Sequence, residues 1–216
     1  MKKYDYIFFD LDGTISDSAA GIINAAVYAM EQMGTPIGDR ERLNKFVGPP
    51  LYDLFRDYVG YSQEETERAV KFFRRYYQER GILENTMFPG MDTLLQKLVA
   101  AGRKPVLATS KPEPFAKEII TRYGITGYFT FIAGSTMDET RAKKSEVVAY
   151  ALEACGIEDP SRAVMVGDRF YDVRGAAENG LDCIGVLYGY GTREELETAG
   201  AVAVAEDIPA LASMLI

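Results

Sequence analysis

Two carboxylates follow a short apolar run near the start of the chain. Residues 4–9 predict a buried strand, and Asp10 and Asp12 come directly after it in the sequence FFDLDGT. Side chains alternate along an extended chain, so both acids point to the same side. Two negative charges this close repel one another, and the repulsion is relieved by a neighbouring cation or by a proton on one acid. The pair therefore predicts a site that handles positive charge or protons.

Other polar residues end the strands predicted later in the chain. Thr109 and Ser110 follow the apolar run KPVLA, and Asp168 follows the run AVMV one residue after it. Lys143 and Lys144 open the helix predicted before that last strand. Ligands of open parallel sheets bind at the carboxyl ends of the strands. Acids, hydroxyls and a lysine gathered there predict a site for a divalent cation and a phosphate group.

The chemistry that suits these residues is metal-assisted phosphoryl transfer. Mg²⁺ takes oxygen ligands, and the expected ones are Asp10, Asp168 and the backbone carbonyl of Asp12, with Asp172 as a supporting partner one helical turn on. A carboxylate can also attack phosphorus, which makes Asp10 the candidate nucleophile and Asp12 the candidate acid and base. A lysine and a hydroxyl would hold the transferring oxygens. This scheme needs no histidine, and the chain has none.

Each motif taken alone has an ordinary structural explanation. Two acids at a strand end are commonly just solvated, Gly13 and Thr14 form a turn, and a lysine pair is commonly part of a solvated helix face. Gly167 and Asp168 fit a turn followed by a helix N-cap. The four motifs, however, fall in order where a doubly wound sheet places its active site. Their joint occurrence favours the catalytic interpretation.

The elements that must position these residues form an α/β pattern with an interruption. The chain begins with a predicted strand, continues with helices only, and then alternates strands and helices. Alternation predicts a doubly wound parallel sheet covered on both faces. We expect a core domain over 1–15 and 83–216 and an inserted all-helical domain over 16–82. The longest helix of the insertion is expected to begin with a capping box of Ser62 and Glu65.

Composition narrows the class of partner. The 216 residues include 24 Lys and Arg against 32 Asp and Glu, for a net charge of -8. This balance argues against a nucleic acid or an anionic membrane as the main partner and leaves room for a small phosphate ester.

The sequence has no apolar run of about 18 residues and no signal-peptide pattern, so we expect a cytoplasmic protein. Cys155 and Cys183 are expected to be buried thiols. No pattern demands a dimer, and a monomer is favoured.

Four stretches carry a resemblance to a known family. FFDLDGTISDS, VLATSKP, TRAKKSEVV and VMVGDRFYDVRGA resemble the four motifs of haloacid dehalogenase-like phosphohydrolases, with a helical cap inserted after the first. Within that superfamily the chain is most similar to the phosphoglycolate phosphatase-like group. GSTMDETRAKK and GVLYGYGTREEL resemble 5'-nucleotidase-like members. The resemblance implies a Rossmann-like core, Mg²⁺ and an aspartyl-phosphate intermediate.

The resemblance also implies a role for each motif residue. These roles are nucleophile and metal ligand for Asp10, acid/base and carbonyl ligand for Asp12, phosphoryl binding for Thr109, metal ligand for Asp168, and fourth-motif partner for Asp172. Ser110 and Gly13 are expected to line the phosphate site beside Thr109. The family lysine falls at Lys144, with Lys143 as the alternative. Tyr171 stands where related phosphatases often carry His.

The expected function is hydrolysis of a small phosphate monoester. An acid at Asp12 fits this reaction, because an ester oxygen needs a proton as it leaves, and true dehalogenases of the family lack that acid. Phosphoglycolate, a nucleotide and a sugar phosphate are the candidate substrates. A phosphotransferase or phosphosugar mutase on the same scaffold, and a non-catalytic binding protein, are the alternatives. Lys45 of the cap could reach an anionic leaving group, although a solvated lysine is the favoured interpretation.

Overall fold

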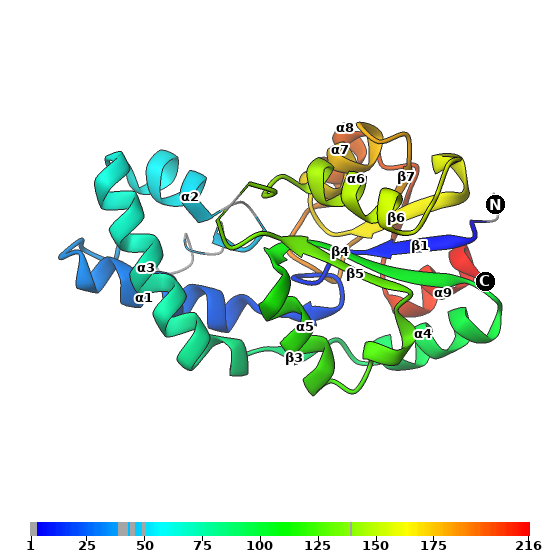
Figure 1. The fold of residues 1–216 in the computed structure, drawn as a ribbon, viewed down its shortest axis with the longest axis horizontal. Helices are drawn as coiled ribbons and strands as arrows, with labels where there is room; N and C mark the ends of the chain where they lie inside the picture. Colours follow the sequence, from blue (N-terminus) through cyan, green and yellow to red (C-terminus); the bar gives the residue numbers. More distant parts are fainter. Residues whose placement is uncertain (1–3, 39–42, 44–45, 49–50, 139) are drawn as a thin grey trace. The chain divides into compact units, whose positions relative to one another are not determined.

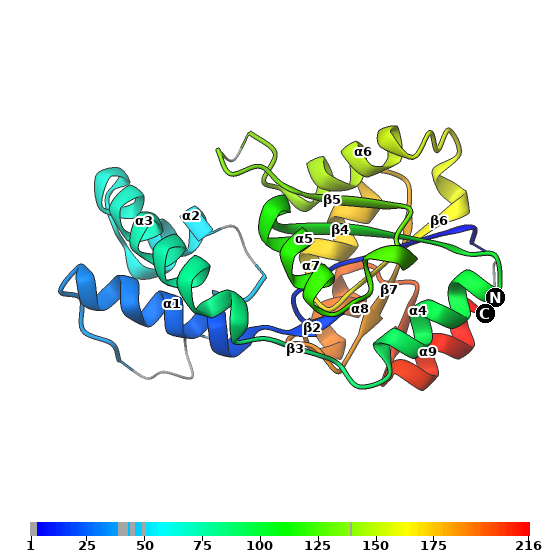
Figure 2. The same ribbon diagram turned by 60° about the horizontal axis from the view of Figure 1, so that its bottom comes forward.

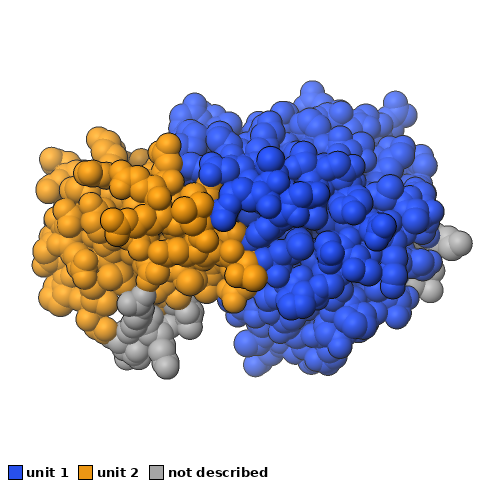
Figure 3. Space-filling view, turned by 90° about the horizontal axis from the view of Figure 1, so that it is seen from below, with its two compact units in different colours: residues 1–16, 87–216 blue, residues 17–86 orange. Residues whose placement is uncertain are grey.

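The computed structural model describes residues 4–38, 43, 46–48, 51–138 and 140–216. The chain divides into two compact units: residues 1–16 with 87–216 form unit 1, and residues 17–86 form unit 2 (Figure 3). The chain passes between the units at two short strands that pair with each other, β2 (Ser16–Asp17) and β3 (Thr86–Met87). Lys45, considered above as a cap residue, lies outside the described residues.

Unit 1 is built on a six-stranded sheet with the order β5-β4-β1-β6-β7-β8. The strands are β1 (Tyr6–Phe9), β4 (Lys104–Pro112), β5 (Phe131–Ser135), β6 (Ala163–Gly167), β7 (Asp182–Val186) and β8 (Ala203–Ala205). Every pairing is parallel, and β1 lies between β4 and β6 with Tyr6 opposite Lys104 and Ala163. The doubly wound parallel α/β fold expected from the sequence is confirmed.

Helices cover both faces of this sheet. They are α4 (Met91–Ala100), α5 (Glu113–Arg122), α6 (Lys144–Ala154), α7 (Phe170–Ala177), α8 (Arg193–Ala199) and α9 (Ile208–Leu215). Helices α6, α7 and α8 lie on one face, and α4, α5 and α9 lie on the other (Figures 1 and 2). Because neither face meets water, the central strands are apolar on both sides.

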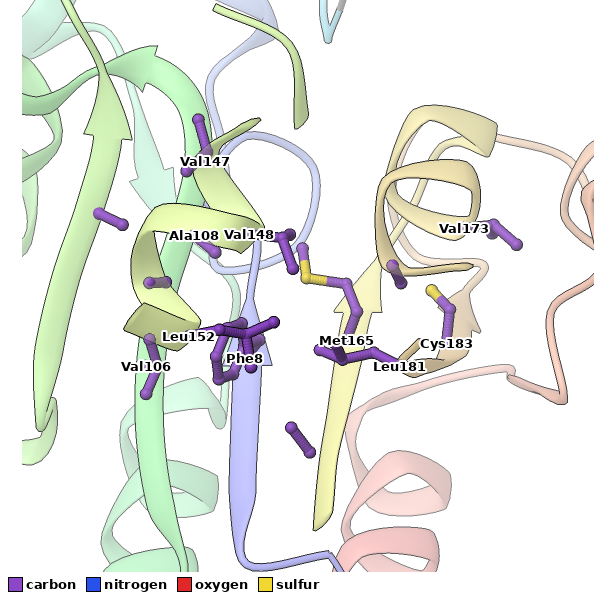
Figure 4. Packing of buried hydrophobic residues seen from close by; sticks show 14 of the residues in the cluster. Phe8, Val106, Ala108, Val147, Val148, Leu152, Met165, Val173, Leu181 and Cys183 are labelled. Carbon is purple, nitrogen blue, oxygen red and sulfur yellow. The ribbon is translucent and has the colours of Figure 1, made fainter. Parts of the chain in front are cut away.

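The core explains why the first strand has no polar position. Phe8 is fully buried and stands opposite Val106 on β4 and Met165 on β6, so the three side chains share a face. They pack against Val148 and Leu152 of α6 (Figure 4). Strand neighbours of Phe8 are equally buried because they face the helices on the other side. The first strand is thereby fixed in the middle of the sheet.

One strand is longer than its sequence pattern indicates. The run KPVLA predicts a strand over 104–108, but β4 continues to Pro112. Its register against β5 shifts after Ala108, and Pro112 then stands opposite Ser135. Pairing with a distant strand, rather than local apolar pattern, keeps this segment extended. The extension places Thr109, Ser110 and Lys111 inside the strand.

Apart from its two connecting strands, the regular secondary structure described in unit 2 is helical. Its helices are α1 (Ala19–Gln32), α2 (Leu51–Asp53), which continues as a π-helix over Leu54–Val59, and α3 (Gln63–Glu79), which leads to a 3-10 turn over Gly81–Leu83. The predicted capping box is present: Glu65 N–H donates to Ser62 Oγ, and Ser62 N–H donates to the Glu65 carboxylate. Among the described residues, no helix has the length and low polarity that a bilayer crossing needs.

Aromatic side chains fill the interior of unit 2. Phe73 and Tyr77, one turn apart on α3, stack with their ring centroids 5.9 Å apart. Phe55 packs edge-on against Phe73 at 6.4 Å. Helix α1 closely approaches the 3-10 turn that follows α3: a Cβ on Gly21 would lie 2.2 Å from the carbonyl oxygen of Gly81. Phe73 and Tyr77 therefore serve as core residues of unit 2.

Candidate active site

Two acids leave the sheet side by side at the carboxyl ends of β1 and β6. Asp10 directly follows β1, and its N–H donates to the carbonyl oxygen of Val166 at 3.0 Å, which continues the ladder between the strands. Asp168 directly follows β6. Both side chains are buried. The parallel pairing of β1 with β6 is what brings together two residues so far apart in the sequence.

The turn after β1 packs against Asp168. Gly13 has a φ of 82°, and a Cβ there would lie 2.2 Å from Asp168 Oδ2. Thr14 Oγ1 donates to Asp168 Oδ1 at 3.4 Å, and Tyr190 N–H donates to Oδ2 at 2.8 Å. The glycine thus provides both a backbone conformation and a clearance that other residues cannot. Gly13 lies against a carboxylate of the site.

A buried lysine joins two of the acids. Lys144, the first residue of α6, places Nζ 2.7 Å from Asp10 Oδ1 and 2.9 Å from Asp172 Oδ1. It also donates to the carbonyl oxygen of Ala108 at 3.1 Å. The preceding Lys143 is exposed. Of the two lysines considered from the sequence, Lys144 is the one that lies among the acids.

A second buried lysine was not anticipated from the sequence. Lys111 Nζ donates to both carboxylate oxygens of Asp12, at 2.8 Å each, and the lysine is 7% exposed. Its N–H donates to Thr109 Oγ1 at 3.2 Å. Ser110, between them in β4, is partly buried and makes no hydrogen bond to these acids in the described structure. The sequence did offer one indication of Lys111: side chains alternate along a strand, so Lys111, two residues after Thr109, lies on the same side of an extended segment as Thr109.

The buried charges of the described residues do not balance. Four carboxylates are buried at the site, against two ammonium groups, which leaves two negative charges uncompensated; the groups are Asp10, Asp12, Asp168, Asp172, Lys111 and Lys144. Carboxylate oxygens of Asp10, Asp168 and Asp172 lie within 4.8 Å of one another. Oxygen donors at this spacing with this excess charge fit one hard divalent cation.

The same imbalance perturbs the ionisation of the acids. Burial, followed by the charges of Asp172 and Asp12, raises the pKa of Asp10 to about 6, although Lys144 opposes the shift. Burial and the charges of Asp172 and Asp10 raise the pKa of Asp168 well above its usual range. A group of acids that resists losing its last protons is one that binds a cation readily, because the cation takes the place of those protons.

Glu195 of α8 holds the segment that follows β6. Glu195 accepts from Arg169 Nε at 2.8 Å and from the N–H of Phe170 at 2.9 Å. Arg169 N–H in turn donates to Asp172 Oδ2 at 3.1 Å. Tyr171 occupies the position at which related phosphatases often carry His, and its ring centroid lies 3.9 Å from that of Phe170. These contacts fix the segment that carries Asp168 and Asp172.

Comparison with known families agrees with this geometry. The family model for haloacid dehalogenase-like hydrolases matches residues 7–186, a span that includes every acid and lysine of the site. The chain belongs to the haloacid dehalogenase-like hydrolase family. The resemblance read from the four motifs is confirmed, and the chain is a hydrolase by family. The match begins in β1 and ends with β7, so it also spans the whole of unit 2.

Individual known proteins are similar to this chain over nearly its whole length. A 5'-nucleotidase of Pseudomonas aeruginosa is 37% identical over 99% of this chain and 96% of its own length. A tyrosine-protein kinase of Mycobacterium tuberculosis, PtkA, is 38% identical over 92% of this chain and 67% of its own. A crystal structure described as a predicted phosphatase from Clostridium acetobutylicum superposes with a TM-score of 0.95 at 39% identity, covering 99% of this chain and 98% of the other.

Proposed function

We propose that this hydrolase is a Mg²⁺-dependent phosphomonoesterase that forms an aspartyl-phosphate on Asp10. The observation that carries the proposal is the uncompensated pair of buried negative charges beside two buried lysines at the carboxyl ends of the strands. Asp10, Asp168 and the carbonyl oxygen of Asp12 would hold the cation, with Asp172 in support. Bound Mg²⁺ would neutralise charge on the phosphoryl oxygens during transfer.

The chain's own residues perform two successive displacements in this proposal. An Asp10 carboxylate oxygen attacks phosphorus, the bond from phosphorus to the ester oxygen breaks, and Asp12 gives its proton to that departing oxygen. Asp12 then takes a proton from water, whose oxygen attacks phosphorus. This second step releases inorganic phosphate and restores the Asp10 carboxylate. Lys144, 2.7 Å from Asp10, orients the nucleophile and favours the negative charge that gathers on the phosphoryl group.

The proposed substrate is a small phosphorylated metabolite: phosphoglycolate, a nucleotide or a sugar phosphate. A nucleoside monophosphate is the first to examine, because the 5'-nucleotidase of Pseudomonas aeruginosa matches over 96% of its length. We further propose that residues 16–82 act as a cap that excludes water and selects the substrate, with 1–15 and 83–216 as the catalytic core.

A second candidate is phosphoryl transfer to an acceptor other than water. The 38% identity to a protein named as a tyrosine-protein kinase favours a hydroxyl acceptor. The same site residues would serve, since Asp12 could deprotonate a hydroxyl as well as water. A non-catalytic role is disfavoured because all four buried acids are present together with both lysines.

The deciding experiment is a measurement of inorganic phosphate from a panel of esters. Purified protein is incubated with nucleoside monophosphates, sugar phosphates, phosphoglycolate and p-nitrophenyl phosphate, with Mg²⁺ or with EDTA. We expect phosphate release in Mg²⁺ and its loss in EDTA. Parallel reactions contain ATP and a tyrosine peptide. Phosphopeptide formation without phosphate release from any ester would contradict the phosphomonoesterase proposal and support transfer.

A further inference from the structure

The contact between Lys111 and Asp12 is the part of the site that the motif roles leave unexplained. Lys111 offers one ammonium group to both oxygens of a single carboxylate, at 2.8 Å each, and both side chains are buried. A buried ion pair is costly to form because both charges give up water. Stability alone therefore gives little reason to place a lysine here.

The backbone holds Lys111 firmly enough to aim its side chain. Its N–H donates to Thr109 Oγ1, and the next residue, Pro112, pairs opposite Ser135 after the register shift. Gly134 of β5 packs against the same segment, because a Cβ there would lie 2.8 Å from the carbonyl oxygen of Lys111. The ammonium group is thus presented from an ordered strand rather than from a mobile loop.

The two buried lysines divide the acids between them. Lys144 contacts Asp10 and Asp172, whereas Lys111 contacts Asp12. In the proposed reaction Asp10 is the nucleophile and Asp12 is the acid and base, so each of these two acids is paired with a different lysine. Because Lys111 donates to both carboxylate oxygens, the Asp12 carboxylate is held in one orientation. When Asp12 carries a proton, that proton occupies one of these oxygens, and Lys111 then contacts the other.

We infer that Lys111 is a positioning residue for the acid–base step: it holds the Asp12 carboxylate in the orientation from which a proton passes to the departing ester oxygen. This inference rests on the proposed function. It has a specific consequence, because the help that Asp12 gives depends on the leaving group. An alkoxide needs a proton as it departs, whereas p-nitrophenolate departs readily without one.

The test compares two esters in Lys111→Met, Asp12→Asn, the double variant and a Lys117→Met control, whose lysine is exposed on α5. The value compared is kcat/KM, since it reports events up to departure of the alcohol and excludes the later hydrolysis of the aspartyl-phosphate. For an alkyl phosphate we expect Lys111→Met to lower kcat/KM about 10- to 100-fold, and for p-nitrophenyl phosphate less than about threefold. Lys117→Met should change neither.

The double variant separates positioning from a general structural loss. In the Asp12→Asn background, Lys111→Met should add little further loss for the alkyl ester, because the group that it positions is already disabled. An equal loss for both esters, or an undiminished loss in the Asp12→Asn background, would overturn the inference. If Lys111→Met is recovered unfolded, Lys111→Arg is judged by the same criteria. Because arginine keeps the positive charge, we expect a smaller loss of kcat/KM, still confined to the alkyl ester.

Failure of the proposed function gives a different result. A wild-type protein that hydrolyses neither ester in Mg²⁺ contradicts the phosphomonoesterase proposal, and the inference falls with it. A wild-type protein that hydrolyses both, with a variant that loses both equally, overturns the role of Lys111 alone.

Discussion

Gly13 and Asp168 approach so closely that a Cβ at Gly13 would lie 2.2 Å from Asp168 Oδ2. We predict that Gly13→Ala is destabilised and impaired in activity, because the carboxylate must shift from its place. Gly102→Ala is the matched control: Gly102 has a φ of 76° and open space around it, so only the backbone conformation is penalised. Urea unfolding should show a loss of about 1 kcal/mol for the control and a larger one for Gly13→Ala. Equal losses with unchanged turnover would contradict the argument.

Adjacent lysines allow a second matched comparison. Lys144→Met leaves Asp10 and Asp172 without their shared cation, so we predict a loss of about 3–5 kcal/mol in unfolding free energy. Phosphate release should fall at least about 100-fold. Lys143 is exposed one residue away, and Lys143→Met should preserve both quantities. Urea unfolding and the phosphate assay check this, and a loss borne by Lys143→Met instead would reverse the assignment.

Asp10→Asn should separate activity from stability. Removing the nucleophile is expected to lower kcat about 10⁴-fold or more. Since burial raises the pKa of Asp10 to about 6, the native state disfavours its ionised form, and a neutral amide should stabilise the metal-free protein near neutral pH. Thermal unfolding in EDTA checks the second point. The exposed Asp92 of α4 supplies the control Asp92→Asn, which should leave activity unchanged. An inactive variant of lowered stability would refute the electrostatic argument.

Metal-free stability should decrease as pH rises from about 4 through about 6. Asp10 and Asp168 have raised pKa values in the folded state, so in this window the folded chain holds protons that the unfolded chain has released. We therefore expect a higher Tm in EDTA at about pH 5 than at about pH 7.5. Mg²⁺ replaces those protons and should raise Tm more at the higher pH. The same Mg²⁺-induced rise at both pH values would contradict this account.

Local pattern was enough to predict the elements that carry the motifs. Apolar runs ending in Asp10 and Asp168 identify strands, and alternation with helices implies a parallel sheet whose carboxyl ends share an edge. Lys111 could not be recognised in that way. Its place depends on β4 staying extended to Pro112, which depends in turn on pairing with Ser135 in β5.

The electrostatic character of the site was also beyond local pattern. The chain has 56 charged residues, 24 basic and 32 acidic, and only the fold determines which six are buried together. Glu195 illustrates the same point from another element, because it anchors the N–H of Phe170 from 25 residues further along the chain. Such partners are set by tertiary packing and leave no periodic signal.

The central position of β1 in the sheet also determines when the acids of the site can come together during synthesis. Tyr6 pairs with Lys104 and Ala163, so β1 can pair only with segments that are synthesised much later. Unit 2, by contrast, is complete by residue 86. Pairings as distant in sequence as those of β1 with β4 and β6 slow folding. A nascent chain that ends before β6 lacks Asp168, so the buried carboxylate cluster of Asp10 and Asp168 can form only after β6 has been made.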